Sequence, residues 1–106
     1  MAKRNVETRR IDSAEVMGEG SYVVLKPVKY GRIREAIAMS QSGDNAAGEQ
    51  LLASLIVGAV VEWDWVDDDE QPLPAPTKPE DLDELYTEEV KFLTAQILPT
   101  AKELKN

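Results

Sequence analysis

The residues in this sequence best suited to chemistry are carboxylates, since the 106-residue chain has 20 Asp and Glu but no His or Cys. The densest group is the run Asp67–Glu70. A calcium-binding EF-hand loop needs alternating acids, a glycine at its sixth position and a glutamate at its twelfth. A loop beginning at Asp67 would place Pro72 at the sixth position, and one beginning at Asp64 would place Asp69 there. The run therefore does not match a specific calcium site.

Other catalytic constellations lack their key residues. Without His the usual general base near neutral pH is missing, and without His and Cys the common zinc, copper, haem and iron–sulfur ligand sets cannot be built. Nothing in the sequence selects a pair of carboxylates for glycoside hydrolysis. The segment Gly18–Ser21 lacks the Gly-Lys-Ser/Thr ending of a phosphate-binding loop. We expect no catalytic residue, no metal and no cofactor, and interpret the chain as a protein that binds another protein.

The charge is large and uneven. The net charge is −8 with a pI of about 4.5, which disfavours binding to a nucleic-acid backbone. Residues 1–34 carry a net +4 and the remainder −12, and the segment Glu62–Glu89 holds twelve acids against Lys78 alone. This polarity predicts a positive end and a strongly negative stretch. The alternative interpretation is a solubilising surface with a weakly folded acidic linker.

No targeting or membrane segment is evident. The basic start of the chain is not followed by an apolar run, so it does not resemble a signal peptide. The most apolar stretch, Leu51–Val61, has eleven residues, well short of the roughly 20 that span a bilayer. We expect a cytosolic protein that contacts no membrane.

The first part of the chain is typical of extended structure. Residues Asn5–Ile11 alternate loosely between two faces, the glycines of Met17–Ser21 favour a turn, and Ser21–Leu25 is rich in β-branched and aromatic residues. These segments predict a two- or three-stranded antiparallel ribbon, which must pack on other elements to be stable.

Two helices are expected next. Tyr30, Ile33 and Ile37 share one helical face, and this helix is predicted to run to about Ser40. The second helix is predicted over 45–61, with Asp44 as its N-cap and a broad apolar face that makes it the central core helix.

The segment Val61–Pro79 changes character, with two Trp, a run of acids and four prolines that forbid a helix or a central strand. We expect an extended arm in which Trp63 and Trp65 point the same way and Asp64 points the opposite way. In the alternative arrangement both indoles fold back as a lid on the core helix, because Trp is usually buried.

The last part of the chain is predicted to be helical again. Pro79 suits the first position of a helix that runs to Leu85, and Thr87 can cap a second helix that Pro99 stops. The predicted fold class is therefore α+β, as one small domain. Its parts are a β-ribbon over 1–27, core helices over 28–61, an extended acidic Pro-rich arm over 62–79 and C-terminal helices over 80–106.

The surface best suited to a partner protein joins the arm to the C-terminal helices. Aromatic anchors in an acidic segment can order on binding, and short helices can form a groove for an amphipathic helix. For each of these apolar residues the alternative is simple core packing. The candidate partner-binding residues are Trp63, Trp65, Leu73, Leu82, Leu85, Phe92 and Leu93.

These segments also carry a family resemblance. VVEWDWVDDDEQPLPAP (60–76), followed by PEDLDELYTEEVKFLTAQI (79–97), resembles the tail assembly chaperones of long-tailed bacteriophages and prophages. The matching features are the Trp at the end of a helix, the acidic turn, the PLP motif and the LDEL-x-x-EE helix start. The specific portion covers Val60–Leu93, and no motif in it fixes contact residues.

The resemblance implies a role in the cytoplasm of the bacterial host. Such a chaperone binds the long helical tape-measure protein, keeps it soluble, brings tail-tube subunits to polymerise around it and is absent from the mature virion. The high negative charge suits a soluble coated complex. Self-association is a further expectation, because the charge polarity can align successive copies head to tail. Mutation of the N-terminal arginines that leaves self-association and its salt dependence unchanged would refute that alignment.

Two other functions stay open. A small structural component of the particle, such as a tail, head-completion or decoration protein, would also be small and acidic. An acidic inhibitor that mimics nucleic acid is the second, although such a mimic should hold its carboxylates on rigid helices and many here lie beside prolines. An enzyme that uses carboxylates alone ranks below both.

Overall fold

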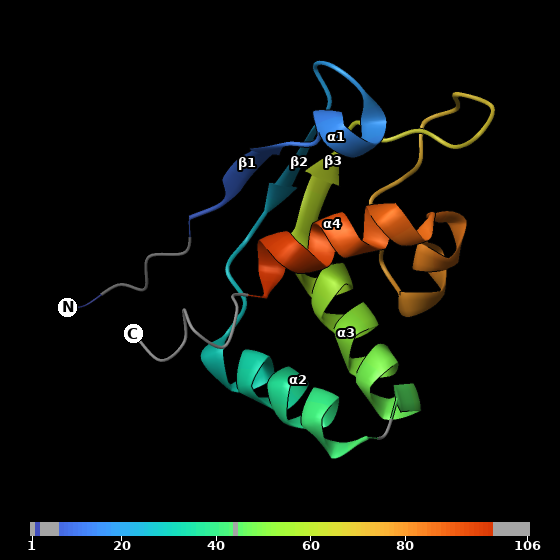
Figure 1. Ribbon diagram of the computed structural model, residues 1–106. Helices are drawn as coiled ribbons and strands as arrows, with labels where there is room; N and C mark the ends of the chain where they lie inside the picture. The colour runs from blue at the N-terminus through green and yellow to red at the C-terminus, as the bar shows by residue number, and fades with distance from the viewer. Residues whose placement is uncertain (1, 3–6, 44, 99–106) are drawn as a thin grey trace.

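The computed structural model describes residues 2, 7–43 and 45–98 and shows a small α+β fold (Figure 1). Three strands form one antiparallel sheet in the order β1-β2-β3. The elements in chain order are β1 (Arg9–Asp12), α1 (Ala14–Met17), β2 (Tyr22–Leu25), α2 (Tyr30–Ser42), α3 (Asn45–Ala59), β3 (Val60–Trp63), the 3-10 helix η1 (Pro79–Glu84) and α4 (Thr87–Ile97).

The central strand β2 has the alternation expected of a sheet with one covered face. Val23 and Leu25 are buried, whereas Tyr22 and Val24 are half-buried. β1 pairs with β2 so that Arg9 lies opposite Leu25 and Asp12 opposite Tyr22. The strand predicted over Asn5–Ile11 therefore starts later and ends later, and positions 5 and 6 lie outside the described residues. The turn predicted over Met17–Ser21 is preceded by the single helical turn α1, and within it Ser21 N–H donates to the Gly18 carbonyl at 3.2 Å.

The third strand comes from the end of the predicted core helix. α3 ends at Ala59 and β3 begins at the next residue, so the prediction of a helix as far as Val61 was wrong. β-branched valines favour the extended conformation here, and the Ala59 carbonyl accepts a hydrogen bond from Lys26 N–H at 2.9 Å. Pairing then shifts register, because Leu25 faces Val60 while Val24 faces Glu62.

The two long helices form a hairpin below the sheet (Figure 1). α2 ends at Gly43, whose φ of 84° is a left-handed conformation that glycine adopts without strain. α2 packs on α3, and among the α2 side chains that the structure describes only Ala36 is buried. The predicted cap Asp44 lies outside the described residues.

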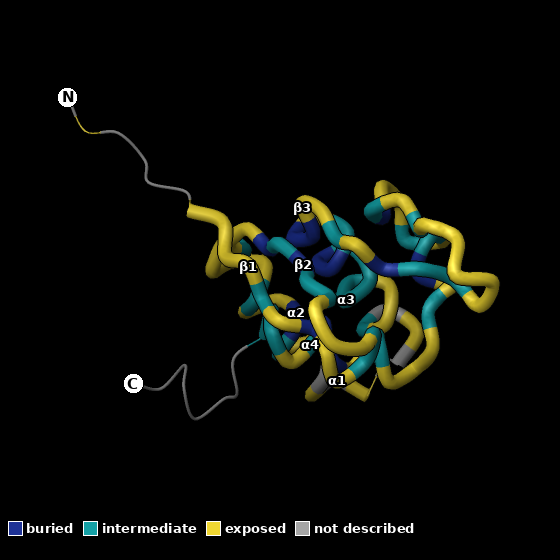
Figure 2. The backbone as a smooth tube through the Cα atoms, turned by 90° about the horizontal axis from the view of Figure 1, so that it is seen from above, coloured by how far each residue is buried: buried dark blue, intermediate teal, exposed yellow. Residues whose placement is uncertain are grey.

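The core lies where α3, the sheet and α4 meet, and α4 crosses in front of the sheet in Figure 1. In Figure 2 the buried segments gather near β2, β3 and α3, whereas the periphery is exposed. The buried hydrophobic cluster consists of Val23, Leu25, Ile56, Ala59, Val60, Trp65, Leu82, Phe92 and Leu93. No helix in the described part of the chain is long and apolar enough to cross a membrane.

Within the segment predicted as an extended arm, residues Val66–Pro72 close into a loop. The Asp67 carboxylate accepts hydrogen bonds from the N–H groups of Asp69 and Gln71 at 2.9 and 3.0 Å. Glu70 takes a positive φ of 61°, and Val66 and Pro72 form an antiparallel bridge. Side-chain acceptors of this kind stabilise tight turns. The loop projects from the body of the molecule in Figure 1.

The two C-terminal helices begin with carboxylate contacts. Asp81 Oδ2 accepts hydrogen bonds from Thr77 N–H at 2.9 Å and from Lys78 N–H at 3.3 Å at the start of η1, where Pro79 is the first helical residue, as predicted. At the start of α4, Glu89 Oε1 accepts from the N–H of Tyr86 at 2.8 Å. Tyr86 is therefore the N-cap of α4, and the prediction that Thr87 fills this position was wrong by one residue.

Candidate partner-binding surface

The two tryptophans form one stacked pair beside the sheet. Their ring centroids are 4.6 Å apart and the rings are inclined by only 4°. Alternation along the extended chain puts both indoles on one side, and Asp64 between them is exposed. Trp65 is fully buried, and Trp63 is half-buried and packs against the same core. The alternative arrangement, with the indoles packed on the core, is the one found.

A chain of hydrogen bonds fixes this pair to the N-terminal part of the protein. Trp65 Nε1–H donates to Ser13 Oγ at 3.0 Å, and Ser13 Oγ lies 2.6 Å from Ser21 Oγ. Ser21 Oγ–H in turn donates to Asp64 Oδ1 at 3.0 Å. Because the single Ser21 hydroxyl proton goes to the carboxylate, Ser13 is the donor in the bond between the serines. In this series of three hydrogen bonds, each donor therefore points toward the next group, and the last acceptor is the negatively charged Asp64 carboxylate.

The proline-containing segment after the acidic loop is held against the Trp pair. Trp63 Nε1–H donates to the Leu73 carbonyl at 2.8 Å, and Leu73 N–H donates to the Trp65 carbonyl at 2.9 Å. The acidic loop is also bonded to the start of α4, since the Tyr86 hydroxyl lies 2.9 Å from both carboxylate oxygens of Asp68. The loop thus contacts the sheet end and the start of α4.

A small pocket opens between the Trp63 ring, the proline-containing segment and η1. Its volume is about 130 Å³, below the roughly 300–1,000 Å³ of typical small-molecule sites. We call it the Trp63 pocket. Its apolar lining is Trp63, Leu73, Pro74 and Leu85, and its polar lining is Glu80, Asp81 and Glu84.

The charged residues that line the Trp63 pocket are all acidic, and Lys78 lies close enough to one of them, Asp81, to act on its charge. A second depression of about 390 Å³ lies on the α3 side of η1, and its charged lining is Glu49, Glu80 and Asp83. Glu80 belongs to both depressions. Within the described part of the chain, no Lys or Arg lies within ion-pair distance of Glu80 or Glu84. The surface on both sides of η1 therefore presents carboxylates without cationic partners.

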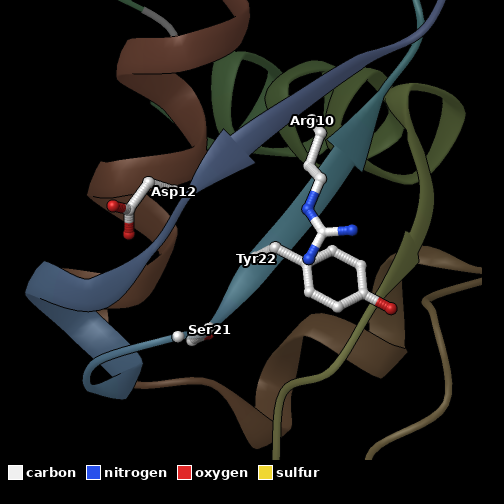
Figure 3. A pocket seen from close by; sticks show the side chains of 5 residues that line it. Arg10, Asp12, Ser21 and Tyr22 are labelled. Atoms are coloured by element: carbon white, nitrogen blue, oxygen red, sulfur yellow. The ribbon is translucent and has the colours of Figure 1, made fainter.

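A third depression, of about 320 Å³, lies over β1 and the start of β2 (Figure 3). Its Arg10 guanidinium stacks over the Tyr22 ring at 3.9 Å, a cation–π geometry. Asp12 points away from Arg10 in Figure 3, and its Oδ1 accepts a hydrogen bond from Ala14 N–H at 2.8 Å. Arg10 and Asp12 thus each contact a neighbour of their own, and their side chains do not point toward a common position where a ligand could bind.

The structure separates the seven predicted partner-binding residues into two groups. Trp65, Leu82, Phe92 and Leu93 belong to the buried core, so their side chains cannot touch a partner in this conformation. The burial follows from the packing of η1 and α4 against α3. The half-buried residues Trp63, Leu73 and Leu85 are the other group, and all three line the Trp63 pocket.

The acidic residues of the site were not predicted as partner-binding residues. Glu80, Asp81 and Glu84 line the Trp63 pocket, but the sequence indicated them only as acids at the start of a helix. The only sequence signal for them is their closeness to Leu85, since all three acids lie within the five residues that precede it. The buried Ser13 carried no such signal, because its partner is 52 residues away.

Two carboxylate contacts near this surface shift pKa values. The backbone N–H of Thr77 is the main cause that lowers the pKa of the Asp81 carboxyl, and partial desolvation opposes it. The hydrogen bond to Asp68 raises the pKa of the Tyr86 hydroxyl, and the negative charges of Asp68 and Glu89 add to that effect. No group of three or more His, Cys, Asp or Glu in the described ranges has the geometry to hold a metal ion.

Comparisons with known proteins returned no similar protein. No protein-family model, no curated protein sequence and no solved structure matches this chain.

Proposed function

We propose that this chain is a tail assembly chaperone of a long-tailed phage or prophage, which binds the tape-measure protein and keeps it soluble until tail-tube subunits polymerise around it. The proposal starts from the resemblance of Val60–Leu93 to such chaperones. The observation that carries it is the Trp63 pocket, which brings three predicted partner-binding residues together at an accessible surface. Two of them, Trp63 and Leu73, are held by hydrogen bonds.

The dimensions and chemistry of the pocket suit a polypeptide client. At about 130 Å³ the pocket has room for one side chain of a partner. Ordered apolar walls need no rearrangement on binding, which reduces the entropy cost of association. Acidic side chains around the pocket keep the free protein soluble while the apolar surface is exposed.

Co-expression with a candidate tape-measure protein tests the proposal. We expect this chain to bring the tape measure into the soluble fraction and to co-purify with it. A tape measure that stays insoluble while this chain remains free in the supernatant contradicts the proposal. Mass spectrometry of purified virions separates a chaperone from a structural component, because the chaperone should be missing from the mature particle.

Variants in the pocket test its part in client binding. The double variant Leu73→Ala/Leu85→Ala removes apolar wall from the Trp63 pocket and should reduce recovery of soluble tape measure. The control is Tyr30→Ala/Val61→Ala, which removes two exposed apolar side chains outside the pocket. Circular dichroism establishes that both variants are folded, and equal loss of client in the two would place the binding surface elsewhere.

A further inference from the structure

The Trp63 pocket combines an apolar interior with a one-sided charge. Its walls include the Trp63 indole, Leu73 and Leu85, and its charged lining is Glu80, Asp81 and Glu84. Glu80 and Glu84 are exposed, and both lie on the 3-10 helix η1. A side chain with an apolar stem and a positive head group matches both features.

We propose that the Trp63 pocket receives one Arg or Lys side chain of a partner polypeptide. The methylene stem lies against Leu73, Pro74 and Leu85, as long basic side chains commonly bury their stems on apolar surface. The charged head pairs with Glu80 and Glu84, which have no cationic partner in the described structure. This inference rests on the proposed function, because it names the residue class by which the client is recognised.

The Trp63 indole adds a further reason for a cation. One face of the ring is covered by Trp65, and the Nε1–H group is used by the Leu73 carbonyl. The Trp63 indole therefore lines the pocket without a free hydrogen-bond donor. A guanidinium near an indole gains cation–π and stacking energy, which makes Arg the preferred occupant over Lys.

The competing occupant is a purely apolar side chain of the partner. Its burial would use the same walls but would leave Glu80 and Glu84 beside a desolvated apolar group. The two occupants differ in one measurable way, because only the basic side chain depends on the carboxylates and on salt concentration.

Titration with matched short peptides distinguishes these occupants. The probes are the blocked peptides Ac-Leu-Ala-X-Ala-Leu-amide, with X as Arg, Lys, norleucine or Glu. Nitrogen-15 NMR of the full chain follows the two indole N–H signals, which the variant Trp63→Phe assigns. We expect Arg and then Lys to move the Trp63 signal in a saturable way that added salt weakens. Norleucine and Glu should move it much less.

The carboxylate variants complete the test. Glu80→Gln/Glu84→Gln should weaken binding of the Arg peptide about three- to fivefold, the size expected for exposed ion pairs. The control Glu15→Gln/Glu19→Gln makes the same charge change at exposed positions outside the pocket and should leave binding unchanged.

The outcomes separate this inference from the proposed function. If the norleucine peptide binds as tightly as the Arg peptide, the proposal of a basic occupant is refuted, but the pocket can still bind an apolar side chain of the client. Peptides that all leave the Trp63 signal unmoved up to their solubility limit overturn the pocket as a binding site. In that case, rescue of the tape measure in co-expression would still support the chaperone function through another surface.

Discussion

The Nε1–H group of Trp65 donates a buried hydrogen bond of 3.0 Å to Oγ of Ser13, across 52 residues of sequence. Both side chains are fully inaccessible to solvent. A buried donor needs an acceptor, because without one the free energy of removing the donor from water is not offset by a hydrogen bond. This bond ties the turn between β1 and β2 to the segment that carries the Trp63 pocket.

Ser13→Ala should lower the free energy of unfolding by about 1–3 kcal/mol, because the Trp65 indole N–H is then left without its acceptor. Urea denaturation followed by tryptophan fluorescence measures the change. The control is Ser54→Ala, the same chemical change on α3 at a residue with no side-chain hydrogen bond in the described structure, which should be close to neutral. Equal midpoints for wild type and Ser13→Ala would show that the buried bond contributes nothing.

The two tryptophans should contribute unequally to stability. Trp65→Phe loses a buried hydrogen bond and core volume, and should cost about 2–4 kcal/mol. Trp63→Phe keeps an aromatic ring on the partly exposed side and loses the bond to Leu73, which should cost about 1 kcal/mol. Denaturation midpoints give the order. Both variants should also lose the near-ultraviolet circular dichroism signal of the stacked indoles, which tests the stacking. A larger loss of stability for Trp63→Phe than for Trp65→Phe would contradict the prediction that the more buried indole contributes more.

Stability should fall at alkaline pH through Tyr86. Its hydroxyl donates to Asp68, so the pKa is raised above its ordinary value of 10.0. A group with a raised pKa stabilises the fold fully below its unfolded pKa and loses that contribution as pH rises through its folded pKa. Unfolding at a series of alkaline pH values should show this loss in the wild type. Tyr86→Phe should lack it, and the same pH profile in both proteins would disprove the contact.

Asp81 predicts a loss of stability on the acid side. Hydrogen bonds from Thr77 and Lys78 lower its pKa below the ordinary 3.8, so its contribution is present above that value and is lost as pH falls toward the lowered pKa. Asp81→Asn should reduce this acid dependence and fray the start of η1. The exposed neighbour Asp83 is the control, and Asp83→Asn should keep the wild-type profile. NMR titration of the Asp81 carboxyl group measures its pKa directly, and a value that is not below 3.8 would contradict the prediction.

The sequence predicted the class of fold and the placing of most elements. β-branched residues over Ser21–Leu25 and the helical periodicity after Tyr30 are local signals, and the structure contains β2 and α2 there. The end of α3 could not be predicted in this way. Val60 and Val61 continue an apolar helical face in the sequence, but pairing with β2 makes them a strand.

The candidate site was predicted in part. Trp63, Leu73 and Leu85 were singled out as apolar residues in an acidic setting, and the structure brings them into one pocket. The same reasoning also selected Leu82, Phe92 and Leu93, which the core buries. An apolar residue looks alike in the sequence whether it faces a partner or the core, since only the packing of η1 and α4 on α3 decides the direction.

By itself the sequence determined the charge asymmetry, the absence of His and Cys, and the alternation that places both indoles on one side. These are properties of composition and of neighbouring residues. Tertiary structure alone decided which indole is buried, which serine accepts its hydrogen bond and which carboxylates surround the Trp63 pocket. Those outcomes depend on contacts between residues far apart in the chain, whose energies no local pattern encodes.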